Sequence, residues 1–133
     1  MEVTEEDWLD EQQDVAYQYM KKTGTNFGSI EHAPSFYLSP YVAVWAVESG
    51  KSPNAIGWWV ITGDLPTDYV SSSGIGGARE AMSEFAKRWQ NSVNVYRSGK
   101  KDPSITLNSE TADLLEKRAH ILMEWASDGS MWK

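Results

Sequence analysis

Two short apolar segments that lie close together in the chain constrain the fold more than any other feature. The first covers residues 41–48 and the second residues 57–62, and both are rich in β-branched and aromatic side chains with no polar face. Such segments are typical of strands that are covered on both sides. The stretch between them has the turn residues Gly50 and Pro53 and is too short for a parallel crossover, so we expect an antiparallel hairpin.

Three segments show the pattern of helices. Apolar side chains recur at helical spacing over residues 5–22, between Thr4 as the N-cap and Gly24 as the residue that ends the helix. A second helix is predicted to begin near Gly77, after a glycine-rich stretch. The third is predicted to follow a cap at Asn108 or Ser109, and its wide apolar stripe indicates a buried helix.

The order of these segments predicts the fold class. Residues 24–40 are predicted to be a connection, with a short strand candidate at residues 35–38, and a second candidate lies at residues 69–70. We expect a single α+β domain over residues 1–133, in the order α-β-β-α-α. In it, a small antiparallel sheet built on the central hairpin packs against three helices.

The negative charge of the chain belongs to its first segment. The net charge is −7, and seven acidic residues with no Lys or Arg lie within the first fourteen positions, whereas the remaining 12 acidic and 12 basic residues balance. No concentrated basic surface exists for a phosphate backbone, so we expect no nucleic-acid binding. The acidic segment suits a helix N-terminus and solubility. As an alternative, it acts as an acidic surface that attracts a basic partner.

Composition excludes several further classes. The chain has no cysteine, so disulfides, thiol nucleophiles and thiolate metal sites are excluded. No apolar run approaches the ~18 residues of a membrane span, so we expect no membrane partner. The start of the chain is acidic rather than basic and then apolar, which is not the pattern of a signal peptide, so a cytoplasmic location is predicted.

The second strand and the residues after it carry the candidate site. Trp58 and Trp59 are adjacent, so their side chains point to opposite faces of the sheet, and one of them is a candidate platform for a ligand or partner. Asp64 and Asp68 follow the strand, and Arg79 lies in the first turn of the next helix, where a cation is poorly placed without a partner. These five residues are the predicted ligand- or partner-binding surface.

Two functions fit this surface, beside a purely architectural salt bridge among the same charges. The first is a binding or interaction module, with a second copy of the chain as one candidate partner. The alternative is an enzyme that acts on a small anionic metabolite, with Asp64 or Asp68 as general base and Arg79 as anion anchor. No nucleophile–base pair is apparent, so the catalytic residues stay unassigned. We expect no metal site, because Asp64 and Asp68 are not part of a dense run of ligands like that of a calcium-binding loop. We expect no cofactor, because the glycine-rich stretch 71–77 lacks the lysine of a phosphate-binding loop.

The chain resembles an uncharacterised single-domain family of small gammaproteobacterial proteins, a domain of unknown function. The resemblance covers nearly the whole chain after the first helix and implies one domain without assigning an activity. It is carried by four phrases: Tyr37-Leu-Ser-Pro-Tyr-Val-Ala-Val-Trp45, Trp58-Trp-Val-Ile-Thr-Gly-Asp-Leu-Pro-Thr-Asp68, Ala78-Arg-Glu-Ala81 with Phe85 and Trp89-Gln90, and Arg118-Ala119 with the ending Met131-Trp132-Lys133.

Overall fold

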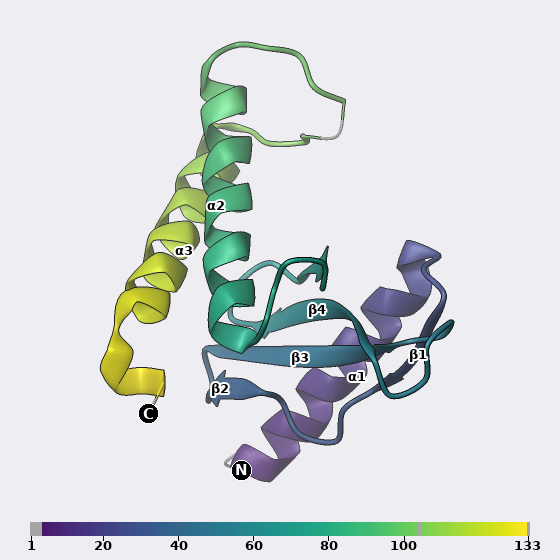
Figure 1. Cartoon of the computed structure of the whole chain (residues 1–133). Coiled ribbons are helices and arrows are strands. Elements are labelled where there is room, and N and C mark those ends of the chain that lie inside the picture. The colour runs from purple at the N-terminus through teal and green to yellow at the C-terminus, as the bar shows by residue number, and fades with distance from the viewer. Residues whose placement is uncertain (1–3, 104, 133) are drawn as a thin grey trace. The chain divides into compact units, whose positions relative to one another are not determined.

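The computed structural model describes residues 4–103 and 105–132, whose elements are helices and an antiparallel sheet, an α+β fold (Figure 1). The described elements are α1 (Glu5–Thr23), β1 (Phe27–Ile30), β2 (Phe36–Leu38), β3 (Val42–Ser49), β4 (Ile56–Gly63), β5 (Asp68–Ser71), α2 (Ala78–Arg97), α3 (Ser109–Ser127) and the 3-10 helix η1 (Gly129–Trp132). They fall into two compact units, one ending at Ala81 and the other beginning at Met82. Within the described part of the chain, no helix is both long and apolar enough to cross a bilayer.

The sheet is built around the predicted hairpin. Its strands run in the order β1-β3-β4-β5, all antiparallel, and β2 pairs with the same side of β3 as β1 does. β3 and β4 each differ from the predicted bounds by one residue at each end. Both short strand candidates are confirmed as β2 and β5. Residues 42–47 of β3 are all buried, as the apolar pattern on both faces predicts.

The strand β1 was not predicted, because residues 27–30 were assigned to a connection. Its sequence Phe-Gly-Ser-Ile has neither the alternation nor the β-branched content of a strand. It pairs with β3 through a bulge between Phe27 and Ile30. The Glu48 side chain lies over Gly28, where a Cβ atom would meet its carboxylate. Contacts with β3, rather than local propensity, therefore make this segment a strand.

Helix α1 begins and ends where local chemistry predicts. The Thr4 Oγ1 atom accepts a hydrogen bond from the Asp7 backbone N–H at 3.0 Å, and Gly24 ends the helix in the left-handed conformation with φ 76°. These contacts satisfy backbone groups that the helix itself leaves without partners. The cap residues therefore mark both helix ends.

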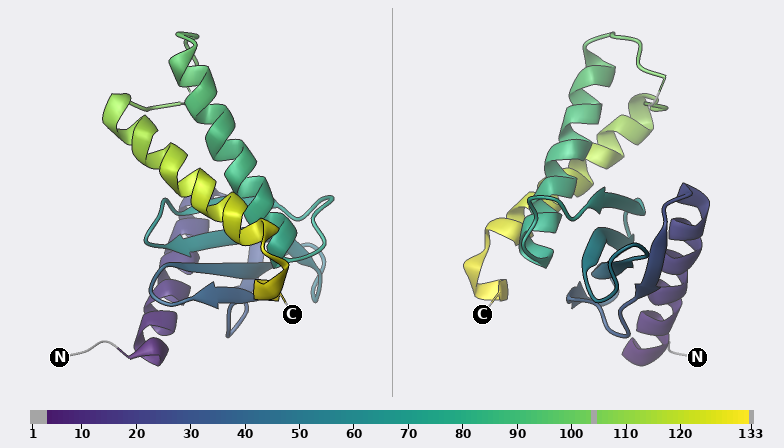
Figure 2. Two further views of the ribbon diagram at one scale, coloured as in Figure 1. Left: turned by 90° about the vertical axis from the view of Figure 1, so that its left-hand side faces the viewer. Right: turned by 45° about the vertical axis from the view of Figure 1, so that its right-hand side comes forward.

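The same helix is docked on one face of the sheet (Figure 2). Its apolar stripe packs against the side chains of β3 and β4 that point to this face, in a core formed by Trp8, Ala16, Met20, Ala43, Trp45, Val47 and Val60. Within this core, the Trp45 Nε1–H donates to the Thr62 Oγ1 at 3.2 Å. Glu5 accepts a hydrogen bond from the Tyr37 phenol of β2, which raises the pKa of that phenol. The acidic helix is therefore part of the fold and not a loosely attached arm.

The second unit contains most of α2 and all of α3. Asn108 and Thr111 form a capping box at the start of α3, with the Thr111 backbone N–H donating to the Asn108 side chain at 2.9 Å. Arg97 at the end of α2 donates to Asp113 at 2.7 Å and to Glu116 at 2.8 Å. These ion pairs tie the far end of α2 to the first turns of α3.

The Arg97 contacts predict a pH dependence of stability. A hydrogen bond from the Gln90 side chain, together with Arg97, lowers the pKa of Glu116 below its ordinary value. A carboxylate with a lowered folded-state pKa stabilises the fold above its unfolded pKa, and this contribution is lost as the pH falls through the folded pKa. We therefore expect the wild-type melting temperature to fall more steeply than that of Arg97→Gln between about pH 5 and pH 3. Circular dichroism melts across this range test it, and parallel curves would contradict it.

Candidate functional site

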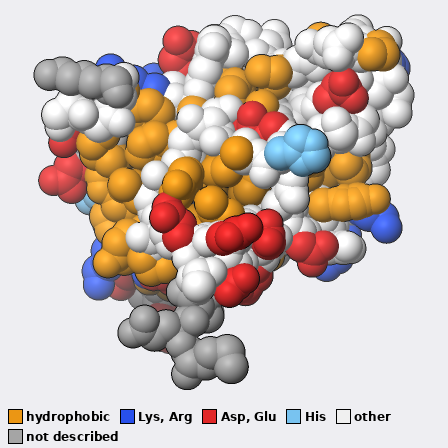
Figure 3. All heavy atoms as spheres, turned by 90° about the horizontal axis from the view of Figure 1, so that it is seen from below, with side chains coloured by type: hydrophobic (Ala, Val, Ile, Leu, Met, Phe, Trp, Pro, Cys, Tyr) orange, Lys and Arg blue, Asp and Glu red, His pale blue; other side chains and the backbone are white. Residues whose placement is uncertain are grey.

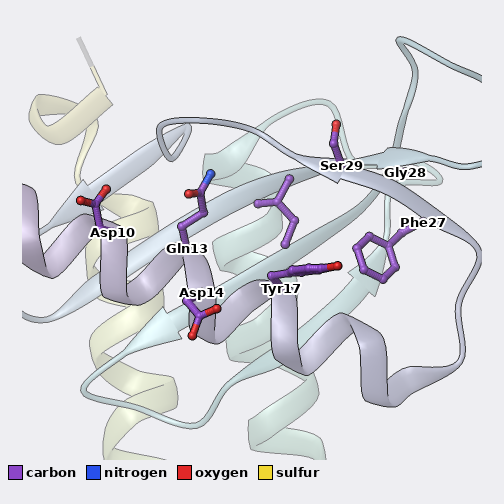
Figure 4. Close-up of a pocket in the computed structure, with 8 residues that line it drawn as sticks. Asp10, Gln13, Asp14, Tyr17, Phe27, Gly28 and Ser29 are labelled. Carbon is purple, nitrogen blue, oxygen red and sulfur yellow. The ribbon is translucent and has the colours of Figure 1, made fainter.

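A hollow lies between α1 and the edge strand β1 (Figure 4). Its volume is about 330 Å³, and we call it the helix-side hollow. Its lining residues are Asp10, Gln13, Asp14, Tyr17, Phe27, Gly28, Ser29 and Ile30. Four come from α1 and four are the whole of β1, so one wall is a helix and the other a strand.

The lining follows from the spacing of residues along α1. Asp10, Asp14 and Tyr17 recur three or four positions apart, so they share one side of the helix. This side lies next to the stripe that docks on the sheet, which places it beside β1. The opposite wall is β1, whose side chains Phe27 and Ile30 also pack against the core under α1.

Two aromatic rings close one end of the hollow. The ring centroids of Tyr17 and Phe27 lie 5.9 Å apart at 73°, an edge-to-face arrangement that fixes both rings. Tyr17 is 41% exposed, so much of its ring is open to a ligand. The Lys21 ammonium lies 5.4 Å from the centroid of the Tyr17 ring, within the range of a cation–π contact. This ring therefore already holds one cation of the chain itself.

The polar groups of the hollow are predominantly acceptors. Asp10 and Asp14 are exposed carboxylates, and none of the described lining residues is basic. Gln13 is engaged otherwise, because its Nε2 donates to the Glu31 backbone oxygen at 2.8 Å and holds the helix against the end of β1. Figure 3 shows further Asp and Glu side chains at the surface, among apolar ones. The hollow is thus suited to a ligand that donates hydrogen bonds and carries positive charge.

The structure separates the two tryptophans of the predicted site. Trp58 is half-buried and packs against the core under α1, whereas the next residue, Trp59, is 3% exposed on the opposite face of the sheet. Their opposite orientation is confirmed. The Trp59 Nε1 atom is buried without a hydrogen-bond partner among the described residues. Neither ring presents a fully open platform in this structure.

The three charged residues of the predicted site lie at different elements. Asp64 is exposed in the turn after β4, Asp68 is half-buried at the start of β5, and Arg79 is exposed in the first turn of α2. The Asp68 Oδ1 atom accepts a hydrogen bond from the Tyr69 backbone N–H at 2.8 Å. A common ligand-binding surface of these residues with the tryptophans stays a prediction.

Sequence reasoning missed the helix-side hollow. Asp10 and Asp14 were recognised as part of the acidic segment and interpreted as helix-start and solubility charges. Phe27 lies in the strand that was predicted as a connection. The available signal was the recurrence of acids and Tyr17 on one side of α1, next to its apolar stripe.

Comparison with protein-family models yields a match over nearly the whole chain. A family model described as a domain of unknown function (DUF4826) matches residues 2–132. Comparison with curated proteins and with solved structures found no match.

Proposed function

The chain belongs to the family DUF4826, a domain of unknown function, so we propose its function from the geometry of the structure. It is a non-catalytic binding module for a positively charged ligand. The helix-side hollow is the proposed binding surface. A cytoplasmic location remains part of this proposal. The sheet-end residues Trp58, Trp59, Asp64, Asp68 and Arg79 stay a predicted second surface.

One observation carries the proposal: two carboxylates and two aromatic rings line the same hollow without a basic neighbour among the described lining residues. A guanidinium or ammonium group gains an ion pair with Asp10 or Asp14 and a cation–π contact with the Tyr17 ring. The Lys21 contact with Tyr17 supports this chemistry, because it shows the ring at cation–π distance from an ammonium. A ligand cation would share or replace that contact.

The same carboxylates suit an organic cation better than a metal ion. No group of three or more Asp, Glu, His or Cys side chains among the described residues is close enough to hold a metal. A hard cation such as Ca²⁺ takes six to eight oxygen ligands, which two exposed aspartates do not supply. The net charge of −7 also favours a cationic partner, since it steers such a partner during diffusion.

The experiment compares a variant of the hollow with a variant of equal charge elsewhere. Asp10→Asn with Asp14→Asn removes both carboxylates, and Glu110→Gln with Glu124→Gln removes two exposed charges of α3. The probe is a blocked tetra-arginine peptide, and its Kd is measured by isothermal titration calorimetry at two salt concentrations. We expect the hollow variant to weaken binding about tenfold, as for two charge-assisted contacts near a surface, and the control about twofold or less.

Two outcomes would overturn the proposal. In one, the peptide does not bind the wild type. In the other, both double variants weaken binding equally, which would show attraction to the net charge alone. Circular dichroism melts establish that each variant is folded.

A further inference from the structure

We propose that the ligand of this module is an extended segment of a partner protein, which adds to the sheet as a strand along β1. Its basic side chains stand at every second position and enter the helix-side hollow. The intervening side chains are small and apolar. This inference rests on the proposed function and specifies the form of its ligand.

The free edge of β1 is the first support. Of the described strands, only β3 pairs with β1. The Gly50 N–H donates to the Asn26 oxygen at 2.9 Å, and the Glu31 N–H to the Ala46 oxygen at 3.3 Å. These bonds flank the pairs Phe27↔Ser49 and Ile30↔Val47.

The positions of those bonds show which way the backbone of β1 points. In an antiparallel ladder, the pairs between such bonds are non-hydrogen-bonded pairs, whose own N–H and C=O groups point away from the partner strand. Phe27 and Ile30 thus present their peptide groups to the open edge. Of the features that protect edge strands, β1 has a short length of four residues and a bulge, but the sequence Phe-Gly-Ser-Ile has no charged residue and no proline. β1 therefore offers the backbone groups that strand addition requires.

A second hollow lies across β1 from the first. It has a volume of about 250 Å³, and we call it the far-side hollow. Its lining residues are Ser29, Glu31, Ala46, Glu48, Asn54, Ala55 and Ile56. Ala46 and Glu48 flank Val47, whose side chain lies in the core under α1, so they point to the other face of the sheet. Ser29 lines both hollows, which places one on each side of the same strand.

The two hollows differ in chemistry. The carboxylates of the far-side hollow are already engaged: Glu31 accepts from the Ala46 N–H at 2.7 Å, and Glu48 accepts from the Asn54 N–H at 3.0 Å. The lining also includes Ala46, which lies on the strand next to β1 and carries no polar side-chain group. An added strand points successive side chains to opposite faces. Its residues therefore alternate between the side of Asp10 and Asp14 and a side on which the carboxylates already accept backbone hydrogen bonds.

The spacing of the carboxylates matches this alternation. Side chains of a strand that share a face recur about every 6.8 Å. Asp10 and Asp14 are one turn apart on α1, which separates their Cβ atoms by about 6 Å. Two basic side chains of an added strand can therefore each face one aspartate.

Charge selects a partner protein over a second copy of this chain. Pairing of two β1 edges would bring together two acidic hollows on two chains of charge −7. Like charges placed face to face oppose association. A basic segment instead gains from the same charges.

The experiment uses two octapeptides with capped termini, each of four arginines and four valines. In the first peptide arginine and valine alternate. In the second the four arginines are consecutive, so the net charge is the same but the two-residue alternation is lost. We expect the alternating peptide to bind the full chain at least tenfold more tightly. Amide hydrogen exchange by NMR should slow at Phe27 and Ile30 when it binds, while the amide of Tyr69 in β5 keeps its rate. Methylation of every second backbone nitrogen of the peptide can be done in two patterns. The pattern that removes the N–H groups facing β1 should abolish binding, and the other pattern should not.

The outcomes separate this inference from the proposed function. Equal binding of both peptides without protection of Phe27 and Ile30 would overturn strand addition and leave the cationic hollow in place. Loss of binding in the Asp10→Asn, Asp14→Asn variant supports the proposed function, and slowed exchange at Phe27 and Ile30 in the wild type supports strand addition. Absence of binding by either peptide would overturn both. Protection of the two amides that grows with protein concentration alone would show that a second copy occupies the edge, which overturns the inference.

Discussion

Replacement of Trp45 by alanine is expected to lower the free energy of unfolding by about 3–5 kcal/mol, the range for truncation of a large aromatic core residue. Trp45 is fully buried and lies in the core between α1 and the sheet. Its removal leaves a cavity beside residues of both layers, which a packed core fills only in part. The melting temperature should fall by roughly 10–20 °C for a chain of this size. Urea unfolding followed by circular dichroism measures the change.

A double-mutant cycle separates the volume of Trp45 from its hydrogen bond. Trp45→Phe retains most of the ring and leaves the Thr62 hydroxyl without its indole donor. Thr62→Val leaves the indole N–H buried without an acceptor. Each should cost about 1–3 kcal/mol, because a buried polar group loses its partner. The double variant should cost less than the two single changes together. Additive costs would show that the bond contributes nothing to stability.

Gly63→Ala is expected to be about as damaging, by about 3 kcal/mol or more, because the backbone itself blocks the added methyl group. Gly63 ends β4 with φ 132°, a conformation that L side chains rarely adopt. A Cβ atom there would lie 2.8 Å from the Tyr41 carbonyl carbon and 2.9 Å from the Val42 Cα. These atoms lie at the start of β3 and in the residue before it, and they cannot move without loss of the Val42↔Gly63 register. Thermal and urea unfolding both test this expectation.

Gly74→Ala is the matched control. Gly74 also has a positive φ, 76°, but an added Cβ would meet no atom within 4 Å. Only the conformational cost remains, about 1–2 kcal/mol for a left-handed residue. A similar loss for both variants would show that strain alone, and not the contact with Tyr41 and Val42, makes glycine necessary at position 63.

The elements that could be predicted from sequence are those with local signals. Thr4 and Gly24 lie within four residues of the backbone groups that they cap, so both ends of α1 are readable without tertiary information. The apolar pattern on both faces predicted β3 and β4 for a similar reason, since it lies within each strand. Because successive side chains of a strand point to opposite faces, the sequence also predicted that Trp58 and Trp59 point apart. Which of the two is more deeply buried depended on the tertiary structure around each ring.

The candidate site shows the opposite case. Asp10 and Asp14 are recognisable in the sequence as charges on a helix. Their position in a hollow depends on β1, whose own sequence does not predict a strand. This strand forms because its backbone pairs with β3, some twenty positions further along the chain. The edge, the bulge and the hollow beside Phe27 all follow from that pairing.

The sequence by itself thus determined the helix ends, the central hairpin, the α+β class and the location of the negative charge. Only the tertiary structure decided that the acidic side of α1 faces an open strand edge. The physical reason is the range of the interactions. Caps and periodic patterns act within a few residues, whereas strand pairing joins distant segments and is stabilised by contacts that neither segment reveals alone.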